Sequence, residues 1–298
     1  MESTKYRDLS LEHRLISDMF PRLSEKEIWE EFKLSDEQLN FFHTFGYLAN
    51  VKILEEEQVE KLRAELDEIR DPGHPRHDLF YEFHTNQSSD PNSVLFHSLG
   101  HWRITEGFHD ILWNPRFVVA ACQLLGGKTV RFWHDQLFCK PAQHGGVVAW
   151  HQDYSYWTRT SPMQHLTCWV GLDDATTDNG CLHYIPGSHR WDLLDRIDLA
   201  GNMDSLKDHL TDEQNEAYEQ KVAIEMPKGY GSFHHPLMVH GSYENRSENS
   251  RRAFVLNVFA DGTRSNSDEE MLVGVPKIVK GEKMEGQFFP VLYNPANI

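Results

Sequence analysis

The first 128 residues mainly carry the hydrophobic periodicity of amphipathic helices. Apolar residues recur three or four positions apart, which places them on one face of a helix. This pattern predicts helices over residues 36–45, 55–71 and 110–125. Ser35 and Gln38 form a capping-box pattern ahead of the first helix, and Gly46 is placed to end it. We therefore expect a mainly helical N-terminal layer.

Two segments within this layer do not follow the helical period. Residues 47–54 (YLANVKIL) predict a short strand between the first two helices. Residues 71–93 are rich in Pro, Ser, Asp and Asn, a composition that is typical of a long loop.

From Thr129 onward the hydrophobic period changes from 3.6 to two, which is the period of β-strands. Five strands rich in Val, Phe, Trp and Thr are predicted, over residues 129–140, 165–172, 180–186, 231–240 and 251–260. In the second of these, Leu166 and Cys168 lie on an apolar face, while Thr167 and Trp169 lie on a mixed one. A strand of this kind suits a sandwich or barrel whose interior holds a site.

The length and composition of the chain fit one folded domain. The chain has 298 residues, of which 39% are hydrophobic and 25% are charged, so an ample core can form. We expect residues 1–298 to form a single domain, with a helical layer over 1–128 packed on an antiparallel β double sheet over 129–298. An acidic insert at 191–220 interrupts the strands and is a candidate lid.

The charge of the chain argues against nucleic acid and membrane partners. The formal net charge is −17, and the clusters of Lys and Arg that bind polyanions or anionic lipids do not occur. No apolar stretch approaches 18 residues, and the opening segment 1–14 lacks the apolar core of a secretory signal. The four cysteines show no C-x-x-C spacing. These features predict a cytoplasmic protein with reduced thiols.

One short stretch, His151–Gln152–Asp153, suggests metal chemistry. In an extended segment residues i and i+2 point to the same face, so His151 and Asp153 would reach one ion together. A third ligand is required, and a later histidine-rich segment offers His234, His235 and His240. Two histidines and one carboxylate leave positions open on the ion, an arrangement that suits Fe(II) oxygenases.

Spacing alone leaves other interpretations of this stretch open. A chain with 18 His and 46 Asp and Glu residues contains several His-x-acid triplets by chance. Other histidines are equally available by spacing, namely His101, His109, His134, His144 and His183. The H-E-x-x-H pattern of zinc hydrolases is absent, as are the G-x-S-x-G elbow and the glycine-rich nucleotide-binding loops.

Arg251 adds a second feature, because it opens a strand that is otherwise almost entirely apolar. Such an arginine either reaches the rim of the protein or binds an anion inside it. A guanidinium group matches a carboxylate with two parallel hydrogen bonds, as a dicarboxylate cosubstrate would require.

In combination these motifs resemble the phytanoyl-CoA dioxygenase family of Fe(II)/2-oxoglutarate oxygenases. The resemblance runs over roughly residues 36–260 in four ordered segments. These are FHTFGYLANVKILEEEQVEKLRAELDEI, WHQDYSYW, CWVGLDDATTDNGCLHYIPGSHRW and GSFHHPLMVHGSYENRSENSRRAF. The last segment fits H-x-S-x-x-N-x-S-x-x-x-R from His240 to Arg251.

The resemblance implies a role for individual residues. The implied iron ligands are His151, Asp153 and His240. The implied 2-oxoglutarate residues are Arg251, Ser242, Trp169, Gln136 and Gln152. Some members of the family also use a lysine upstream of the strands, and in this region the chain offers Ser98 or His97 instead.

The family also implies a fold and a reaction. The fold is a double-stranded β-helix (a cupin-like jelly roll) braced by the N-terminal helices, which agrees with the strand pattern. The reaction uses Fe(II), 2-oxoglutarate and O2, with ascorbate as a stimulant, and oxidises a C–H bond while releasing succinate and CO2. The carboxylate at 153 favours hydroxylation, since related halogenases have a small residue there.

The substrate is less well defined by the sequence. Tyr154, Trp157 and His134 are candidates for the pocket wall. The acidic surface disfavours a CoA thioester, so a carboxylic acid, an amino-acid derivative or a secondary metabolite is expected. The alternatives are a non-catalytic jelly-roll protein that binds or senses a metal or 2-oxo acid, and an isomerase of the same fold. The sequence leaves the oligomeric state open.

Overall fold

We describe the protein from a computed structural model, which covers residues 7–22, 24–88 and 90–297. Residues 1–6, which belong to the opening segment where no secretory signal is predicted, lie outside these ranges. The helices are α1 (Glu25–Phe32), α2 (Asp36–Phe45), α3 (Glu56–Ile69), α4 (Glu106–Asp110), α5 (Pro115–Leu124) and α6 (Asp212–Tyr218).

The strands are mostly short and antiparallel. They are β1 (Tyr47–Lys52), β2 (Glu82–His84), β3 (Phe96–Leu99), β4 (Val130–Lys140), β5 (Val148–His151), β6 (Thr160–Ser161), β7 (His165–Gly171), β8 (Leu182–Tyr184), β9 (Val222–Ile224), β10 (Tyr230–His234), β11 (His240–Ser242), β12 (Arg251–Ala260), β13 (Arg264–Ser265) and β14 (Val291–Tyr293).

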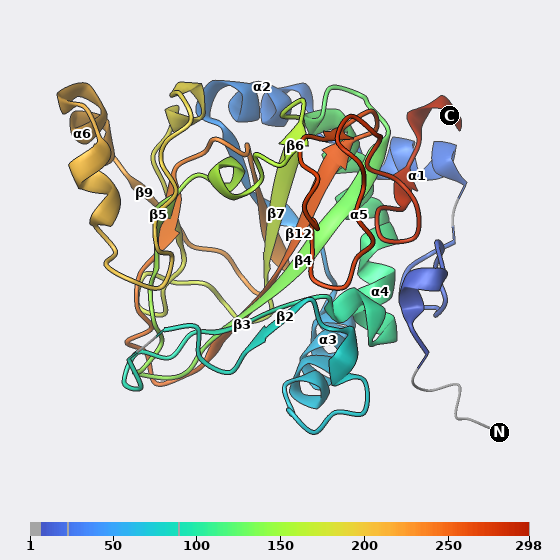
Figure 1. Ribbon diagram of the computed structural model, residues 1–298, viewed down its shortest axis with the longest axis horizontal. Helices are drawn as coiled ribbons and strands as arrows, with labels where there is room; N and C mark the ends of the chain where they lie inside the picture. The colour runs from blue at the N-terminus through green and yellow to red at the C-terminus, as the bar shows by residue number, and fades with distance from the viewer. Residues whose placement is uncertain (1–6, 23, 89, 298) are drawn as a thin grey trace.

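The described strands form a large sheet, a smaller one and a two-stranded sheet of β6 and β13. The large sheet has the order β1-β10-β7-β12-β4-β3-β2, with β14 also paired to β4. The smaller sheet has the order β5-β11-β8-β9. The long strands β4, β7 and β12 cross the middle of the molecule, with β5 and α6 to one side of them and α1, α4 and α5 to the other (Figure 1).

The main hydrophobic core lies between the large sheet and the N-terminal helices. Along β7, Leu166, Cys168 and Val170 point into this core, as the alternation of the strand predicts. The Phe117 ring of α5 stacks on Phe233 of β10, with ring centroids 6.2 Å apart. One face of the large sheet is therefore covered by helices, which leaves its other face to the smaller sheet.

Several predicted elements are confirmed by the structure. The Ser35 hydroxyl caps α2 at the Gln38 amide, and Gly46 ends this helix in the left-handed conformation at φ 83°. The strand at 47–54 and the helix at 55–71 are present as β1 and α3. All four cysteines are buried with free thiols, as predicted.

Three predicted boundaries were wrong. The helix over 110–125 is interrupted, because Asn114 is extended and Pro115 begins α5 as a new helix. The loop at 71–93 contains β2, a strand of three residues whose sequence has no apolar alternation to reveal it. The strand over 231–240 is two strands, β10 and β11, since Pro236 lies between them and cannot donate to a sheet.

In the part of the chain that the structure describes, no helix has the length and apolar character needed to cross a membrane.

The stacking of α5 on β10 makes a testable contribution to stability. Phe233→Ala removes a fully buried ring and leaves a cavity, so we predict a loss of about 3–5 kcal/mol in the free energy of unfolding. Urea denaturation measures this value. Phe41→Ala is the control, because this ring is 38% exposed and its removal should cost clearly less.

Candidate active site

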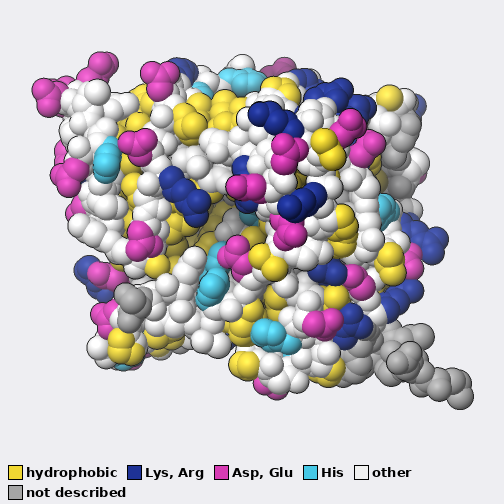
Figure 2. All heavy atoms as spheres, in the orientation of Figure 1, with side chains coloured by type: hydrophobic (Ala, Val, Ile, Leu, Met, Phe, Trp, Pro, Cys, Tyr) yellow, Lys and Arg dark blue, Asp and Glu magenta, His cyan; other side chains and the backbone are white. Residues whose placement is uncertain are grey.

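A cavity of about 390 Å³ lies between the two sheets. Its wall includes side chains from β4, β7 and β12 of the large sheet and from β5, β8 and β11 of the smaller one. The middle of the space-filling surface is hollowed, with hydrophobic side chains inside and charged side chains around the rim (Figure 2).

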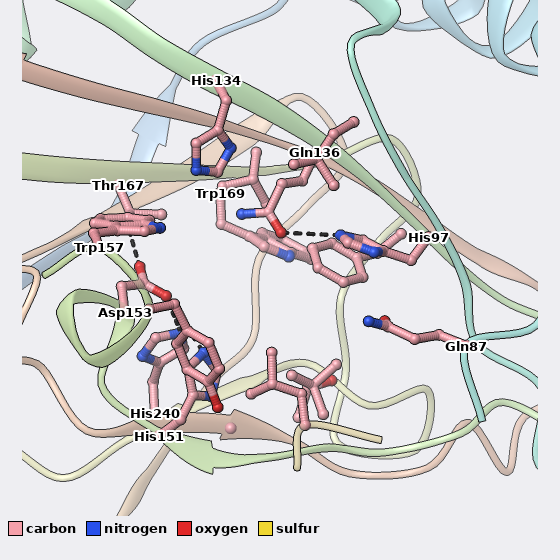
Figure 3. Close-up of a pocket in the computed structure, with 18 of the residues that line it drawn as sticks. Gln87, His97, His134, Gln136, His151, Asp153, Trp157, Thr167, Trp169 and His240 are labelled. Carbon is pink, nitrogen blue, oxygen red and sulfur yellow. Dashed lines mark hydrogen bonds and ion pairs between the residues drawn. The ribbon is translucent and has the colours of Figure 1, made fainter. Parts of the chain in front are cut away.

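Three potential metal ligands converge on one side of this cavity (Figure 3). His151 ends β5 and pairs directly with His240, which begins β11. Asp153 follows in a short 3-10 turn, and its Oδ1 lies 3.3 Å from His151 Nε2 and 3.6 Å from His240 Nε2. The three ligand atoms all lie within 4.8 Å of one another.

The backbone fixes the orientation of both imidazoles. His151 Nδ1 lies 2.7 Å from the Ala149 carbonyl oxygen, and His240 Nδ1 lies 2.9 Å from the Met238 carbonyl oxygen. Each Nδ1–H can donate to its carbonyl, so each Nε2 presents a lone pair toward Asp153. Burial and the neighbouring His151 ring lower the pKa of His240 well below its usual value, which keeps it in the neutral, metal-binding form.

The second oxygen of Asp153 is held by hydrogen bonds away from the two imidazoles. Its Oδ2 accepts from the Thr167 hydroxyl at 2.6 Å and from His234 Nε2 at 3.0 Å. His234 Nδ1 in turn lies 2.9 Å from the Tyr184 hydroxyl. Burial alone would raise the pKa of Asp153, but His240 and the hydrogen-bonding histidines hold it well below the usual range. A carboxylate fixed in this way offers one oxygen to an ion.

The structure gives different roles to the three histidines that the sequence offers as a third metal ligand. His240 forms one ligand group with His151 and Asp153, while His234 Nε2 hydrogen-bonds the second carboxylate oxygen of Asp153. His235 Nδ1 instead accepts from the Leu237 backbone amide, and its ring packs near His189. Two imidazoles and one carboxylate, with space beside them in the cavity, fit Fe(II) with open coordination positions.

Arg251 forms another part of the cavity wall, and Lys140 lies next to it without lining the cavity. Arg251 begins β12, directly opposite Lys140 at the end of β4, and both side chains are buried. Lys140 Nζ lies 2.6 Å and Arg251 Nη2 lies 3.2 Å from the Ser242 hydroxyl oxygen. The Arg251 guanidinium also lies over the Trp169 ring, 5.3 Å from the centroid.

No carboxylate of the described residues lies beside these two basic side chains, although Lys140 donates to the oxygens of Ser242 and Tyr243. Within the described ranges, no Asp or Glu lies within ion-pair distance of Arg251 or Lys140, and Arg251 Nε is buried without a hydrogen-bond partner. Burial lowers the pKa of Arg251 to about 10 and that of Lys140 well below its usual value. Because a buried charge without a counter-ion is costly, this end of the cavity is suited to an anion.

Lys140 was missed in the sequence, although a signal for it was present. Gln136 and Lys140 lie on the same face of β4 by the period of two, and Gln136 was predicted to face the cosubstrate.

Of the two residues considered in place of the family lysine, His97 lines the cavity and Ser98 does not. His97 Nε2 lies 3.1 Å from Gln136 Oε1, and burial lowers the pKa of His97 to about 4.

Two of the predicted site residues lie outside the cavity wall. The Gln152 amide donates to the Asp192 and Leu237 carbonyl oxygens and accepts from the Leu194 amide, so it ties the insert to the core. We therefore no longer assign Gln152 to 2-oxoglutarate. The Tyr154 hydroxyl donates to the Thr160 carbonyl oxygen, which turns this side chain away from the cavity.

The other candidates for the pocket wall line the cavity. Trp157 and His134 lie near the triad, with ring centroids 5.6 Å apart. The start of the insert contributes Arg196, Ile197, Asp198 and Leu199 to the wall. The Tyr156 hydroxyl donates to the Ile197 carbonyl oxygen at 2.6 Å, which holds this segment over the site. That the insert opens and closes as a lid stays a prediction.

Comparisons with known proteins agree with this geometry. A model of the phytanoyl-CoA dioxygenase family matches residues 42–253. The chain is similar to a phytanoyl-CoA dioxygenase of Arabidopsis thaliana, with 29% identity over 268 residues that cover 79% of this chain and 92% of the relative.

Solved structures show the same architecture. One is the α-ketoglutarate-dependent epimerase SnoN of nogalamycin biosynthesis (20% identity, 87% of this chain and 96% of that chain, TM-score 0.71). Another is EctD from S. alaskensis with 2-oxoglutarate and 5-hydroxyectoine (20% identity, 97% of this chain and 94% of that chain, TM-score 0.66). The predicted jelly-roll fold is confirmed.

The hydrogen bond from Thr167 to Asp153 gives a prediction about metal binding. Thr167→Val keeps the shape of the side chain but removes the donor, so we predict that Fe(II) binds about 10- to 100-fold more weakly. Anaerobic titration of metal-free protein measures the affinity. Thr263→Val is the matched control, because this buried hydroxyl bonds only to the Ala260 carbonyl oxygen. Equal affinity in all three proteins would contradict the role given to Thr167.

Proposed function

The chain belongs to the phytanoyl-CoA dioxygenase family, and on that premise we propose that it hydroxylates a C–H bond of a small carboxylic acid. It is a 2-oxoglutarate-dependent non-haem iron oxygenase, with iron, 2-oxoglutarate and O2 as its reactants and cofactors. The observation that carries the proposal is the presence, in one cavity, of the His151–Asp153–His240 triad and of Arg251, a buried arginine with no carboxylate of the described residues in ion-pair range.

Each group has a defined role in this proposal. His151, Asp153 and His240 hold the iron, and Thr167 and His234 fix the carboxylate that binds it. Arg251 receives the distal carboxylate of 2-oxoglutarate, and Ser242, Trp169 and Gln136 line its position. Lys140 holds the Ser242 hydroxyl without lining the cavity itself. When bound, iron with 2-oxoglutarate and O2 supplies the oxidising chemistry, and succinate and CO2 are released. The three iron ligands are themselves buried, which limits their contact with water.

The side chains at the rim of the cavity favour a substrate that carries a carboxylate group. Arg196 lines the cavity from the insert, and its guanidinium lies over the Tyr156 ring, 4.8 Å from the centroid. No carboxylate of the described residues lies within ion-pair distance of Arg196, whereas Arg159 is occupied by the Glu270 and Met271 carbonyl oxygens. Arg196 is therefore free to pair with a substrate anion.

The same rim disfavours a substrate with many negative charges. Glu82 and Asp198 also line the cavity and would repel several phosphate groups. A molecule with one carboxylate, such as an amino-acid derivative, fits this mixture of charges better than a CoA thioester does.

The first experiment tests the iron and 2-oxoglutarate sites together. Fe(II) and then 2-oxoglutarate are added to metal-free protein without O2, and the visible charge-transfer band of the chelate is recorded. We expect the band in the wild type and in Arg252→Gln, since Arg252 pairs with Asp173 outside the cavity. In Asp153→Ala we expect no charge-transfer band. In Arg251→Gln we expect the half-maximal band to require at least about 30-fold more 2-oxoglutarate than in the wild type.

Two outcomes would contradict this assignment. The first is a wild-type protein that binds iron but gives no band with 2-oxoglutarate, which would favour the non-catalytic alternative. The second is a charge-transfer band that develops at the same concentration of 2-oxoglutarate in Arg251→Gln and in Arg252→Gln.

The second experiment tests the class of substrate. Small carboxylic acids and their methyl esters are compared by the rate of succinate release in air. We expect one or more acids to stimulate release, with the matching ester inactive. We also expect Arg196→Gln to raise the KM for the acid about tenfold or more, because a charge-assisted contact is lost. Arg246→Gln, a surface arginine paired with Glu244, is the control. Stimulation by esters as strong as by acids would refute the role of Arg196.

A further inference from the structure

A second group of potential metal ligands lies across the cavity from the triad. Glu82 and His84 are two residues apart on β2, the edge strand of the large sheet, so both point to one face. His84 pairs directly with His97 of β3, which places His97 on the same face. Figure 3 shows His97 on the opposite side of the cavity from His151, Asp153 and His240.

The ligand atoms of this group lie close to one another but are not yet at the spacing of a bound metal ion. The three ligand atoms all lie within 4.8 Å of one another, and His84 Nε2 lies 3.6 Å from Glu82 Oε2. The rings of His84 and His97 are parallel, with centroids 6.2 Å apart. Ligands about 2.0–2.2 Å from a tetrahedral ion lie closer together than this. The Glu82 and His84 side chains are both about half exposed, so they are free to close the remaining gap.

The hydrogen bonding of His97 points to a missing ligand. Its Nε2 lies 3.1 Å from Gln136 Oε1, an acceptor, so Nε2 carries the proton and Nδ1 carries a lone pair. Nδ1 is buried, and no described residue gives it a hydrogen bond. Histidines that bind metals usually donate their other N–H to an oxygen in this way. Nδ1 is thus available to a hydrogen-bond donor or a cation, and Glu82 and His84 each place a ligand atom within 4.8 Å of a ring nitrogen of His97.

We propose that Glu82, His84 and His97 form a second metal site, distinct from the iron triad, that binds a transition-metal dication such as Zn²⁺. Two neutral imidazoles and one carboxylate are a donor set that zinc accepts, with water in the fourth position. The ion joins the edge strand β2 to β3. It thereby stabilises the wall of the cavity that also contains Gln136.

The test is the zinc stoichiometry of metal-free protein, measured by calorimetry or by equilibrium dialysis. We expect two Zn²⁺ ions per wild-type chain, because the triad also accepts zinc. We expect one ion in His84→Ala, one in Asp153→Ala and none in the double variant. His43→Ala is the matched control, because this exposed histidine of α2 belongs to neither group, and it should bind two.

A second measurement separates the new site from the iron site. In Asp153→Ala, excess Zn²⁺ should raise the melting temperature, and this rise should disappear when His84→Ala is added. Two ions in His84→Ala, or no zinc bound by Asp153→Ala, would overturn the proposal. A failure of the triad alone would differ, since the wild type and Asp153→Ala would then both bind one ion, and the oxygenase assignment would be affected instead.

Discussion

The site depends most on the buried positive charge of Arg251. Arg251 begins β12 directly opposite Lys140 of β4, and no carboxylate of the described residues lies in ion-pair range of it. Lys140 donates to the oxygens of Ser242 and Tyr243 and so has its own partners. An unpaired guanidinium is costly to bury, so the fold carries a cost that an incoming anion relieves. The cavity is thus prepared for a ligand with a carboxylate at this end and a metal-binding group at the other.

Strand pairing brings these groups together from distant parts of the sequence. Pairing of β5 with β11 places His151 beside His240, and pairing of β4 with β12 places Lys140 beside Arg251. The break after His234 lets the chain leave the large sheet as β10 and enter the smaller sheet as β11. A shift of one residue in either pairing would turn these side chains to the opposite face. The register of the strand pairing therefore determines which side chains meet in the site.

Much of this arrangement was accessible from the sequence, because periods of two and 3.6 predict which residues share a face. The alternation in β7 correctly placed Thr167 and Trp169 in the cavity. Long-range pairing has no such local signal: the period of two places Lys140 on the face of Gln136, but it does not show that Arg251, more than a hundred positions away, lies beside it. Gln152 lies between two predicted ligands, but the backbone groups that bind its amide belong to 192, 194 and 237. The three residues of β2 are too few to show a period.

The most direct measurement of the central claim compares 2-oxoglutarate with 2-oxopentanoate, which has the same chain length but no distal carboxylate. The dissociation constants are measured by anaerobic calorimetry on the Fe(II)-loaded wild-type protein. If Arg251 awaits an anion, 2-oxoglutarate binds at least about 30-fold more tightly, since leaving a buried charge unpaired costs about 2 kcal/mol or more. Equal affinity for the two acids would contradict the account.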